Sequence, residues 1–511
     1  MEMKDAAGRY PLQIAADTNV SVNVRRAIYQ QMSSKELFTA IQAQLWDEVK
    51  YLLKHATKTS LQNVGRSSRS QDYDHAIHLA ARYGAPRNIL EAILHVDPDC
   101  LCALGRFNRT VLHYGIMTTC MDVKDIQFLL DQDPVGDLLT TSDSVYGMNP
   151  VHLAAAKRYP EIVQCLVMDG KKKGKDMRTT QDRNGRLPLH WAVDVTSRLG
   201  LKHWKFSQRA VIEDRKYYDT VDALVDEQGH VLNQENRESY TALHLAIMSD
   251  VSTPAVVRRL LSLPAKPSLT HRELDLAAQY ATNEAIFAEI CNNPTFGNQI
   301  VSVNEKEHKM SALHYASKYN SNARIVRLLM KKESEYLSKY PDQLHRFFVT
   351  VPDDNGNLPL HHACESRFSP PETMVALIEQ YKDIVHTYRT PTSSTNYILT
   401  KLGEFGGADK VNKRNDLPLH LAINADADQT AELYSRIINV LIDTFPQALF
   451  AEQSPLVLAL QTSRRLRKLD VQIVTKMLSF YNHIGDAEQK QEIPDEVDLS
   501  LYFTTNETAF Q

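Results

Sequence analysis

Eight histidines of this 511-residue chain stand in nearly the same local sequence, so the chemistry of histidine is considered first. Three of them end the phrase Leu-Pro-Leu-His, and five end looser copies of it. The eight positions are His78, His113, His152, His190, His244, His314, His361 and His420. An imidazole can act as a general base, a metal ligand or a structural hydrogen-bonding group. Catalysis needs one histidine with its partners, whereas this one recurs along the chain, so we expect a structural role.

Few other residues are spaced as metal ligands or redox groups. His361, His362 and Glu365 lie close in sequence, but adjacent helix positions do not share a face and should not bind one ion. Cys100-x-Cys102 is the only close pair among six cysteines, and Cys-x-x-Cys is absent. Scattered cysteines are typical of buried thiols in a reducing compartment. We therefore expect no metal and no cofactor.

Short motifs of catalysis and nucleotide binding are also missing. Lys171-Lys-Lys-Gly-Lys175 places a glycine among lysines, but without the Gly-x-x-x-x-Gly-Lys-Ser/Thr spacing of a phosphate-binding loop. We interpret this stretch as a solvated finger tip, with a nuclear-import or acidic-partner patch as the alternative. No nucleophile elbow or dinucleotide fingerprint appears. The sequence predicts a protein without enzymatic activity; a site within the insertions described below is the minor alternative.

Each histidine is predicted to lie in a short helix that follows a tight turn. Asp182-Arg-Asn-Gly185 and Asp353-Asp-Asn-Gly356 precede two motifs, and Asn-Gly readily adopts the positive φ of a hairpin turn. Prolines stand where these helices should begin, a position at which the missing N–H costs nothing. They are Pro150, Pro188, Pro359 and Pro418.

A second apolar run follows each motif after a break that often contains proline. Ile162, Val163, Leu166 and Val167 show the i, i+3, i+4 spacing of an amphipathic helix. The unit is therefore a turn, a short helix, a break and a longer helix. One such pair has too little core to be stable alone and must pack on the next pair.

This unit resembles the ankyrin repeat, whose signature Thr-Pro-Leu-His-x-Ala is nearly met by Thr241-Ala-Leu-His-Leu-Ala246. The resemblance extends from about Tyr10 to about Asn482. It implies an all-α solenoid of about ten to twelve stacked helix-turn-helix units with hairpin-like finger loops. In this family the histidine bonds to the start of its own helix and to neighbouring turns.

The expected organisation is one continuous array with atypical ends. Residues 1–59 should form capping repeats, 60–74 a polar linker or long finger loop, and 75–482 the array. A decayed motif copy places Asp275 where the histidine would stand. The acidic residues of 483–511 predict a disordered tail.

Uneven motif spacing indicates insertions near residues 199–216, 332–351 and 386–411. We expect these insertions to form loops, because a packed repeat interface cannot absorb extra residues without opening cavities. Loops of this length are either functional or merely tolerated, and the sequence favours neither.

Charge and hydropathy limit the class of partner and the location. A net charge of −4 argues against wholesale binding to nucleic acid or a membrane surface. No apolar stretch is long enough for a membrane span, and the N-terminus has no signal-peptide core. We expect a soluble monomer in the cytoplasm, with the nucleus as a second location.

The family resemblance implies partners on the concave side of the array, at finger tips and at two positions four and five residues after the motif histidine. Tyr83 and Tyr319 are the best anchor candidates, since tyrosine is enriched among binding hot spots. The expected partner-binding residues are Arg82, Tyr83, Met117, Thr118, Lys157, Asp194, Met248, Lys318, Tyr319, Glu365 and Asn424.

The function that follows is a non-enzymatic scaffold or adaptor for partner proteins. The alternative is a regulatory or substrate-presenting subunit of an enzyme complex, which docks through the inserted loops or the acidic tail.

Overall fold

A computed structural model describes most of the repeat array. It covers residues 34–54, 56, 58–61, 74–118, 120–193, 214–249, 253–263, 267, 269–281, 283–293, 309–339, 349–387, 411–424, 439, 441 and 477. The described residues form helices joined by turns and include no β-strand, which confirms the expected all-α fold. The chain divides into two compact units, Met1–Ser268 and Leu269–Gln511.

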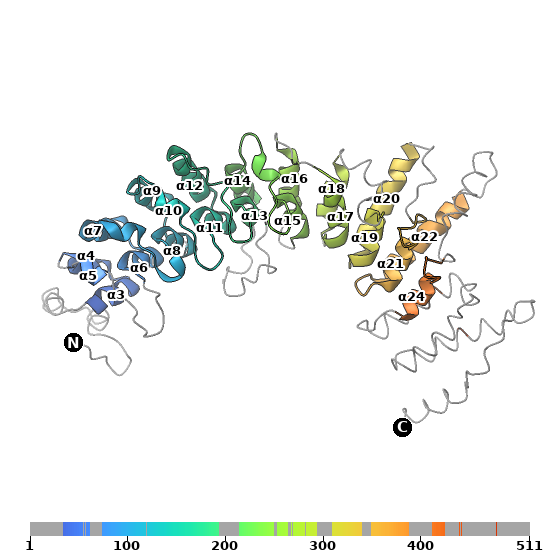
Figure 1. Cartoon of the computed structure of the whole chain (residues 1–511), viewed down its shortest axis with the longest axis horizontal. Helices are drawn as coiled ribbons and strands as arrows, with labels where there is room; N and C mark the ends of the chain where they lie inside the picture. The colour runs from blue at the N-terminus through green and yellow to red at the C-terminus, as the bar shows by residue number, and fades with distance from the viewer. Residues whose placement is uncertain are drawn as a thin grey trace, which may run out of the picture. The chain divides into compact units, whose positions relative to one another are not determined.

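Unit 1 stacks its helices in two layers (Figure 1). Its helices are α3 (Ser34–Gln42), α4 (Trp46–Leu53), α5 (Lys58–Leu61), α6 (Ala76–Arg82), α7 (Arg87–Val96), α8 (Val111–Thr118), α9 (Val123–Asp131), α10 (Asp137–Thr140), α11 (Pro150–Lys157), α12 (Pro160–Lys172), α13 (Pro188–Val193), α14 (Asp214–Leu224), α15 (Ala242–Met248) and α16 (Pro254–Ser262). The motif helices α6, α8, α11, α13 and α15 contact one another in sequence. The longer helices α9, α12, α14 and α16 contact one another in the second layer.

Unit 2 repeats this arrangement. Its helices are α17 (His271–Tyr280), α18 (Glu284–Asn292), α19 (Ala312–Tyr319), α20 (Ala323–Lys339), α21 (Pro359–Glu365), α22 (Pro371–Thr387) and α24 (Pro418–Asn424). The motif helices α17, α19, α21 and α24 pack in one layer, and α18, α20 and α22 pack in the other. Each unit is therefore a stack of helix pairs.

Turn and proline chemistry sets the start of the motif helices as predicted. Pro150, Pro188, Pro359 and Pro418 are the first residues of α11, α13, α21 and α24. In the preceding turns Gly185 and Gly356 adopt φ values of 71° and 77°, which an L side chain rarely tolerates.

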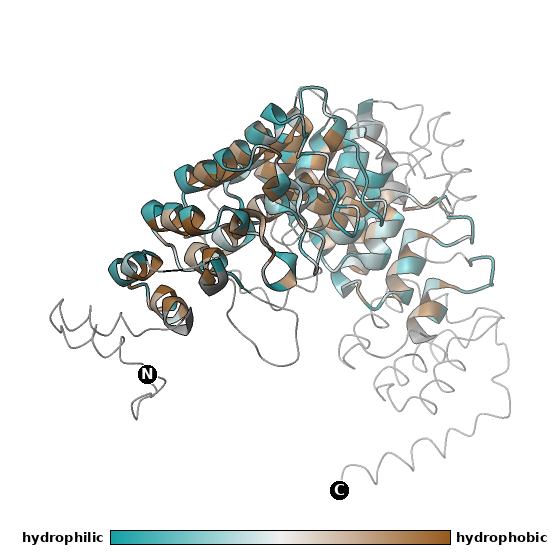
Figure 2. Cartoon of the chain, turned by 60° about the vertical axis from the view of Figure 1, so that its left-hand side comes forward, coloured by the Kyte–Doolittle hydropathy of each residue, from teal (hydrophilic) through white to brown (hydrophobic). Residues whose placement is uncertain are grey.

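The core lies between the two layers, where small and apolar side chains meet. Ala154 and Ala155 of α11 are fully buried and allow α13 to approach closely. Trp191 and Tyr217 are the largest fully buried side chains among the described residues. Figure 2 shows the same pattern as brown, hydrophobic segments on the helices of both layers and teal on many of the connecting turns.

One expectation about the insertions is wrong. Residues 332–339 were expected in a loop, but they form the last two turns of α20. The helix continues because its extension packs against the equally long α22, with Glu333 buried and Gln380 Nε2 3.4 Å from Ser334 Oγ. Residues 214–216 of the first insertion begin α14 and residues 386–387 of the third end α22, so the loop expectation is wrong there too, whereas 349–351 and 411 lie outside helices. Residues 199–213, 340–348 and 388–410 lie outside the described residues.

The lysine-rich stretch is only in part the expected solvated finger tip: Lys171, Lys172 and Gly174 are exposed, and Lys173 and Gly174 form a turn. Lys171 and Lys172 end α12, while Lys173 Nζ donates to Leu130 O at 2.8 Å and to Asp169 Oδ2 at 2.5 Å. Lys175 Nζ donates to Val135 O at 2.7 Å. Two of the four lysines therefore complete carbonyl hydrogen bonds of the preceding repeat, where helix ends leave acceptors unpaired.

Within the predicted N-terminal segment 1–59, α3 and α4 pack on each other as a helix pair. The His-less copy at Tyr10–Ala16, residues 62–73 of the predicted linker and the acidic segment 483–511 lie outside the described residues.

Candidate partner-binding surface

The motif histidines hold the repeats in register through both ring nitrogens. In all eight, Nδ1 accepts a hydrogen bond from the backbone N–H three residues earlier. The donors are His75, Thr110, Asn149, Leu187, Thr241, Ser311, Leu358 and Leu417. The imidazole thus satisfies a backbone donor that the start of a helix leaves without a partner.

The second nitrogen joins each repeat to the next. His113 Nε2 lies 2.9 Å from Met148 O, and His152 Nε2 lies 3.0 Å from Arg186 O. His78, His190, His314 and His361 make the same contact at 3.0, 3.1, 3.2 and 3.2 Å. Because Nδ1 accepts, the proton must sit on Nε2, so each of these six histidines is a neutral donor.

Burial reinforces the neutral form. Desolvation lowers the pKa of His113 and His152 to about 4, and that of His314 to about 3, well below the ordinary value of 6.5. A histidine that is neutral at physiological pH and bonded at both nitrogens has no nitrogen available for a substrate or a metal ion.

The repeat of α17, which lacks the histidine, uses a different residue from the one expected. Asp275 was placed at the motif position, but Glu273 makes the equivalent contact: its Oε2 accepts from Thr270 N at 2.7 Å. A Thr-x-x-Glu capping box at the start of α17 therefore replaces the imidazole.

Five finger turns are closed by an Asp or Asn that accepts two backbone N–H groups: Asp143, Asp182, Asn236, Asp353 and Asn412. Asp182 Oδ1 accepts from Asn184 and Arg186, each at 2.8 Å, and its Oδ2 accepts from Trp191 Nε1 at 2.9 Å. Asp353 repeats the arrangement in unit 2, with His362 Nε2 in place of the indole at 3.0 Å. These side chains fix the shape of each finger.

Successive fingers are also joined to one another through the backbone. In unit 1, Ser144 N donates to Phe107 O at 2.8 Å, Arg183 N to Tyr146 O at 3.1 Å, and Arg237 N to Asn184 O at 3.0 Å. In unit 2, Lys413 N donates to Asn355 O at 3.0 Å. The finger tips therefore form a ladder of fixed register in unit 1, and two fingers of unit 2 are joined in the same way.

The surface beside the motif helices carries several of the predicted binding residues. Arg82 and Glu365 are exposed, and Tyr319 is 40% exposed. Tyr83, Met117, Thr118, Lys157 and Lys318 are half-buried. In the two units a base lies over the neighbouring ring in the same way, Arg82 over Tyr83 at 5.9 Å and Lys318 over Tyr319 at 5.3 Å.

A comparison of the sequence with family models agrees with these structural features, namely the stacked helix pairs, the histidine bonds between repeats and the finger ladder. A family model described as ankyrin repeats (3 copies) matches residues 77–178 and 274–388. These two segments of the chain are ankyrin repeats.

One solved structure with which the chain was compared is the crystal structure of the ankyrin repeat domain of Bcl-3, a unique member of the IkappaB protein family. The two chains are 19% identical, and their superposition has a TM-score of 0.32. The match covers 58% of this chain and 98% of that chain. The comparison with curated proteins gave no match.

For one predicted contact residue of the ankyrin array, the expected exposure to solvent is wrong. Met248 was expected at the surface, but it is only 6% exposed. It is the last residue of α15, which packs on α13 and α16, and burying its apolar side chain removes area from water. Asp194 lies outside the described residues, as does the side chain of Asn424.

Sequence reasoning missed exposed groups in the turns. Phe368, in the short turn after α21, is 50% exposed and has Arg367 over its ring at 4.9 Å. Ser366 beside it is buried and its hydroxyl donates to Lys318 O. The available signal in the sequence was Phe368, an aromatic residue between Arg367 and Ser369 in the turn that joins two helices.

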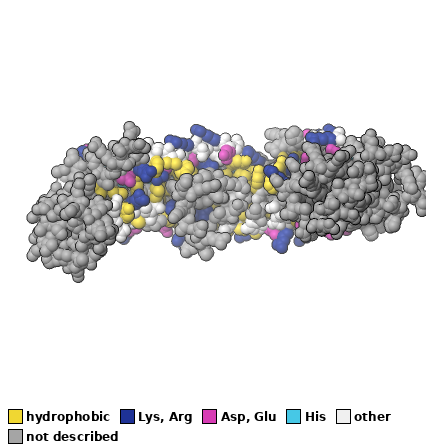
Figure 3. Space-filling view, turned by 90° about the horizontal axis from the view of Figure 1, so that it is seen from below, with side chains coloured by type: hydrophobic (Ala, Val, Ile, Leu, Met, Phe, Trp, Pro, Cys, Tyr) yellow, Lys and Arg dark blue, Asp and Glu magenta, His cyan; other side chains and the backbone are white. Residues whose placement is uncertain are grey.

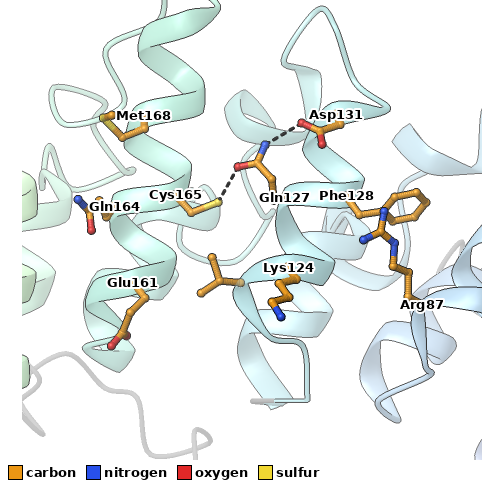
Figure 4. Close-up of a pocket in the computed structure, with 10 residues that line it drawn as sticks. Arg87, Lys124, Gln127, Phe128, Asp131, Glu161, Gln164, Cys165 and Met168 are labelled. Atoms are coloured by element: carbon orange, nitrogen blue, oxygen red, sulfur yellow. Dashed lines mark hydrogen bonds between the residues drawn. The ribbon is translucent and has the colours of Figure 1, made fainter.

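A shallow groove of about 570 Å³ lies on the other layer of the ankyrin array, between α7, α9 and α12 (Figure 4). Its polar groups bond to each other: Cys165 Sγ donates to Gln127 Oε1 at 3.3 Å, and Gln127 Nε2 donates to Asp131 Oδ1 at 2.7 Å. Burial raises the pKa of the Cys165 thiol to about 11, which makes it a poor nucleophile at neutral pH.

Metal binding has no support in the part of the chain that is described. The side chains of His361 and His362 have separate partners, Asp416 O and Asp353 Oδ2. Among the described residues, no three or more His, Cys, Asp or Glu side chains are grouped so that they could hold a metal ion. None of the described helices combines the length and apolarity that crossing a membrane requires.

Proposed function

We propose that this protein is a non-enzymatic scaffold or adaptor, which binds partner proteins on the side of the array formed by the motif helices and fingers. Ankyrin repeats generally mediate protein–protein interaction, and the histidine contacts between repeats support that role here. A surface held in place before binding loses little conformational entropy when a partner docks.

The base and aromatic pairs are the expected anchor points. Arg82–Tyr83 and Lys318–Tyr319 occupy the same position relative to the motif histidine in the two units. Each pair combines a charge with a broad apolar ring, the composition that dominates binding hot spots.

The test is affinity capture from native extract with mass-spectrometric identification. The variants are Arg82→Glu/Tyr83→Ala in unit 1 and Lys318→Glu/Tyr319→Ala in unit 2, with Lys50→Glu/Tyr51→Ala on α4 as the control. We expect at least one surface variant to lose a partner that the control retains, with all variants folded by circular dichroism. A partner retained by both surface variants would contradict the proposed surface.

The alternative of a regulatory subunit depends on inserted loops and an acidic tail that lie outside the described residues. It stays a prediction. Deleting residues 486–498 separates the two, since the scaffold function predicts that capture survives the deletion and tail docking predicts that it fails.

A further inference from the structure

Three exposed aromatic side chains of unit 2 lie at the ends of successive motif helices. Tyr280 is the last residue of α17 and is 38% exposed, and Tyr319 is the last residue of α19. Phe368 lies in the turn after α21. Among the described residues, no other Phe, Tyr or Trp side chain is exposed to this extent. These three residues are here called the aromatic row.

The stacking of the motif helices sets the order of the row. α19 packs on α17 and on α21. Tyr280 and Tyr319 occupy equivalent positions, because each ends its motif helix and is followed by a turn of the same length, residues 281–283 and 320–322, before the next helix. The turn after α21 is longer, residues 366–370, and Phe368 lies within it.

A buried amide joins the first two turns of the row. Asn320 directly follows Tyr319, and its Nδ2 donates to Ala278 O at 2.8 Å and to Ala281 O at 3.1 Å. These two carbonyls come before and after Tyr280 in the chain. The two tyrosines are therefore held one helix spacing apart, which is about 8–10 Å for packed helices.

A hydroxyl joins the third ring to the second. Ser366 Oγ donates to Lys318 O and accepts from Phe368 N at 3.0 Å. Because one oxygen makes both hydrogen bonds, Phe368 N lies within about 6 Å of the Lys318 carbonyl, at the end of α19. Phe368 reaches this place from the α21 side, so the three rings follow the order of the helices.

Two bases accompany the second and third rings. Lys318 lies over the Tyr319 ring at 5.3 Å, and Arg367 lies over the Phe368 ring at 4.9 Å. Among the described residues, neither base forms an ion pair. Glu365 is the exposed acid of these two turns. Two bases against one acid make this end of the row basic, so an acidic partner complements it.

On the face shown in Figure 3, hydrophobic side chains lie among dark-blue Lys and Arg side chains where the described surface is visible. Such a mixture alone therefore does not identify a site. The aromatic row differs because its rings come from successive repeats at a set spacing. The residue before Tyr280 is Gln279, so the bases accompany only the other two rings.

The spacing of the two tyrosines selects the conformation of a bound chain. A polyproline II helix has three residues per turn and rises about 3.1 Å per residue, so every third residue returns to the same face after about 9.3 Å. An α-helix returns to one face after seven residues, about 10.5 Å. A β-strand does so after two or four residues, about 6.6 or 13 Å. Of these repeats, that of polyproline II matches the spacing of packed helices.

We propose that the aromatic row binds a proline-rich segment of a partner protein in the polyproline II conformation, with one proline on each ring and acidic residues beside Tyr319 and Phe368. This inference rests on the proposed function and names the chemistry of the partner. Proline-rich segments dock on aromatic side chains, and their preformed conformation loses little entropy on binding. The acidic residues pair with Lys318 and Arg367.

The test measures peptide binding to the full chain by fluorescence anisotropy. The probe is a nine-residue peptide with proline at its second, fifth and eighth positions, glutamate at its sixth and ninth, and alanine elsewhere. The reversed peptide is included because either chain direction satisfies the spacing. The comparison peptide has the same composition, but its prolines stand at the third, fourth and eighth positions, on three different faces. We expect one spaced peptide to bind at least ~10-fold more tightly than the comparison peptide.

Two variants test where the peptide binds. Tyr319→Ala/Phe368→Ala should weaken the spaced peptide by at least ~10-fold. Val135→Ala/Met168→Ala, which removes two exposed apolar side chains of unit 1, should stay within about twofold. Equal loss in the two variants, or equal affinity for spaced and comparison peptides, would overturn the proposal in favour of non-specific apolar attraction.

A charge swap tests the acidic flank without removing a ring. In Lys318→Glu/Arg367→Glu we expect the preference to reverse, so that a spaced peptide with lysine in place of both glutamates binds more tightly than the original. A variant that still prefers the glutamate peptide would contradict the proposed pairing.

Two further outcomes also reject the inference. One is that a fifteen-residue helical peptide, with leucine at its first, eighth and fifteenth positions, binds more tightly than the proline peptides and loses affinity in Tyr319→Ala/Phe368→Ala. The row would then take an amphipathic helix. The other is that neither spaced proline peptide binds, while affinity capture loses a partner in Lys318→Glu/Tyr319→Ala. The latter rejects the polyproline ligand and leaves the proposed scaffold function standing.

Discussion

The protonation state of the motif histidines is fixed by two backbone groups rather than by an acidic neighbour. In His152, Asn149 N donates to Nδ1 at 3.3 Å, and Nε2 reaches Arg186 O in the next repeat at 3.0 Å. A serine-protease histidine needs one nitrogen free for its nucleophile, whereas here both are committed. The same two contacts explain why the residue is histidine: no other neutral side chain offers a planar acceptor and donor at opposite ends of a ring.

Replacing one motif histidine should therefore cost more than a typical core substitution of similar size. His152→Ala removes two hydrogen bonds: the Asn149 N–H loses its acceptor, and the Arg186 carbonyl keeps the bond from Asp182 N. We expect a loss of about 2–4 kcal/mol in the free energy of unfolding. The measurement is urea unfolding followed by circular dichroism.

The matched control is Arg82→Ala, an exposed residue that should change stability by about 0.5 kcal/mol or less. If His152→Ala and Arg82→Ala proved equally mild, the contact between repeats would contribute little to stability.

At the scale of an element, the finger is the part whose shape depends most on glycine. Gly185 has a φ of 71° and also lies under Arg237, so a methyl group there would meet the next finger at 3.1 Å. Gly174 has nearly the same φ, 70°, but nothing lies within 4 Å of its Cβ position. The two glycines differ in crowding and share the backbone requirement.

Gly174→Ala should therefore report backbone strain alone, about 1 kcal/mol, because only the left-handed conformation opposes the methyl group. Gly185→Ala should cost about 1–3 kcal/mol more, since the ladder between fingers must also shift. Chemical unfolding of the two variants side by side measures the difference. Equal losses of stability in the two variants would show that the neighbouring finger moves aside at no cost in free energy.

The sequence predicted those structural elements whose local sequence recurs along the chain, and it missed features that occur once. The motif helices and their proline starts were predicted because several copies carry the same local signal. The sequence could not predict the burial of Met248 or the hydrogen bonds of Lys173 and Lys175. Each of these depends on a neighbouring repeat, which no local sequence pattern describes. The extension of α20 was missed since its last two turns are polar, and their partner α22 lies later in the chain.

The candidate site was predicted less well than the fold. Counting four or five residues from the histidine located exposed Arg82, Tyr319 and Glu365, yet the finger tips were named only as a class. The equivalence of Arg183 and Arg237 becomes visible once the ladder fixes their register.

At the scale of the whole molecule, the buried histidines make stability depend on pH. Burial lowers the pKa of His78, His113, His152 and His190 to about 4. The unfolded chain has a histidine pKa of about 6.5 and so binds more protons between these values. The stability that these groups contribute is fully present above pH 6.5 and is lost as the pH falls toward 4.

We expect the urea midpoint to fall steeply from pH 7 to pH 5. Each of these histidines contributes a slope of about 1.4 kcal/mol per pH unit within the window. The measurement is urea unfolding at half-unit pH steps and constant ionic strength. A midpoint that stays level, or rises, on acidification would show that the histidines are protonated without loss of the fold.

The hydrogen bond between repeats forms whatever number of residues separates the histidine from the carbonyl oxygen that it reaches. At His78 the carbonyl it reaches is 25 residues away, and at His361 it is 55 residues away, with distances of 3.0 and 3.2 Å. The acceptor is a backbone oxygen, which every residue type supplies. Lengthening the chain between a motif histidine and the next finger therefore leaves the joint intact, which makes these segments natural places for a sequence to acquire new material, or for an engineer to graft a tag.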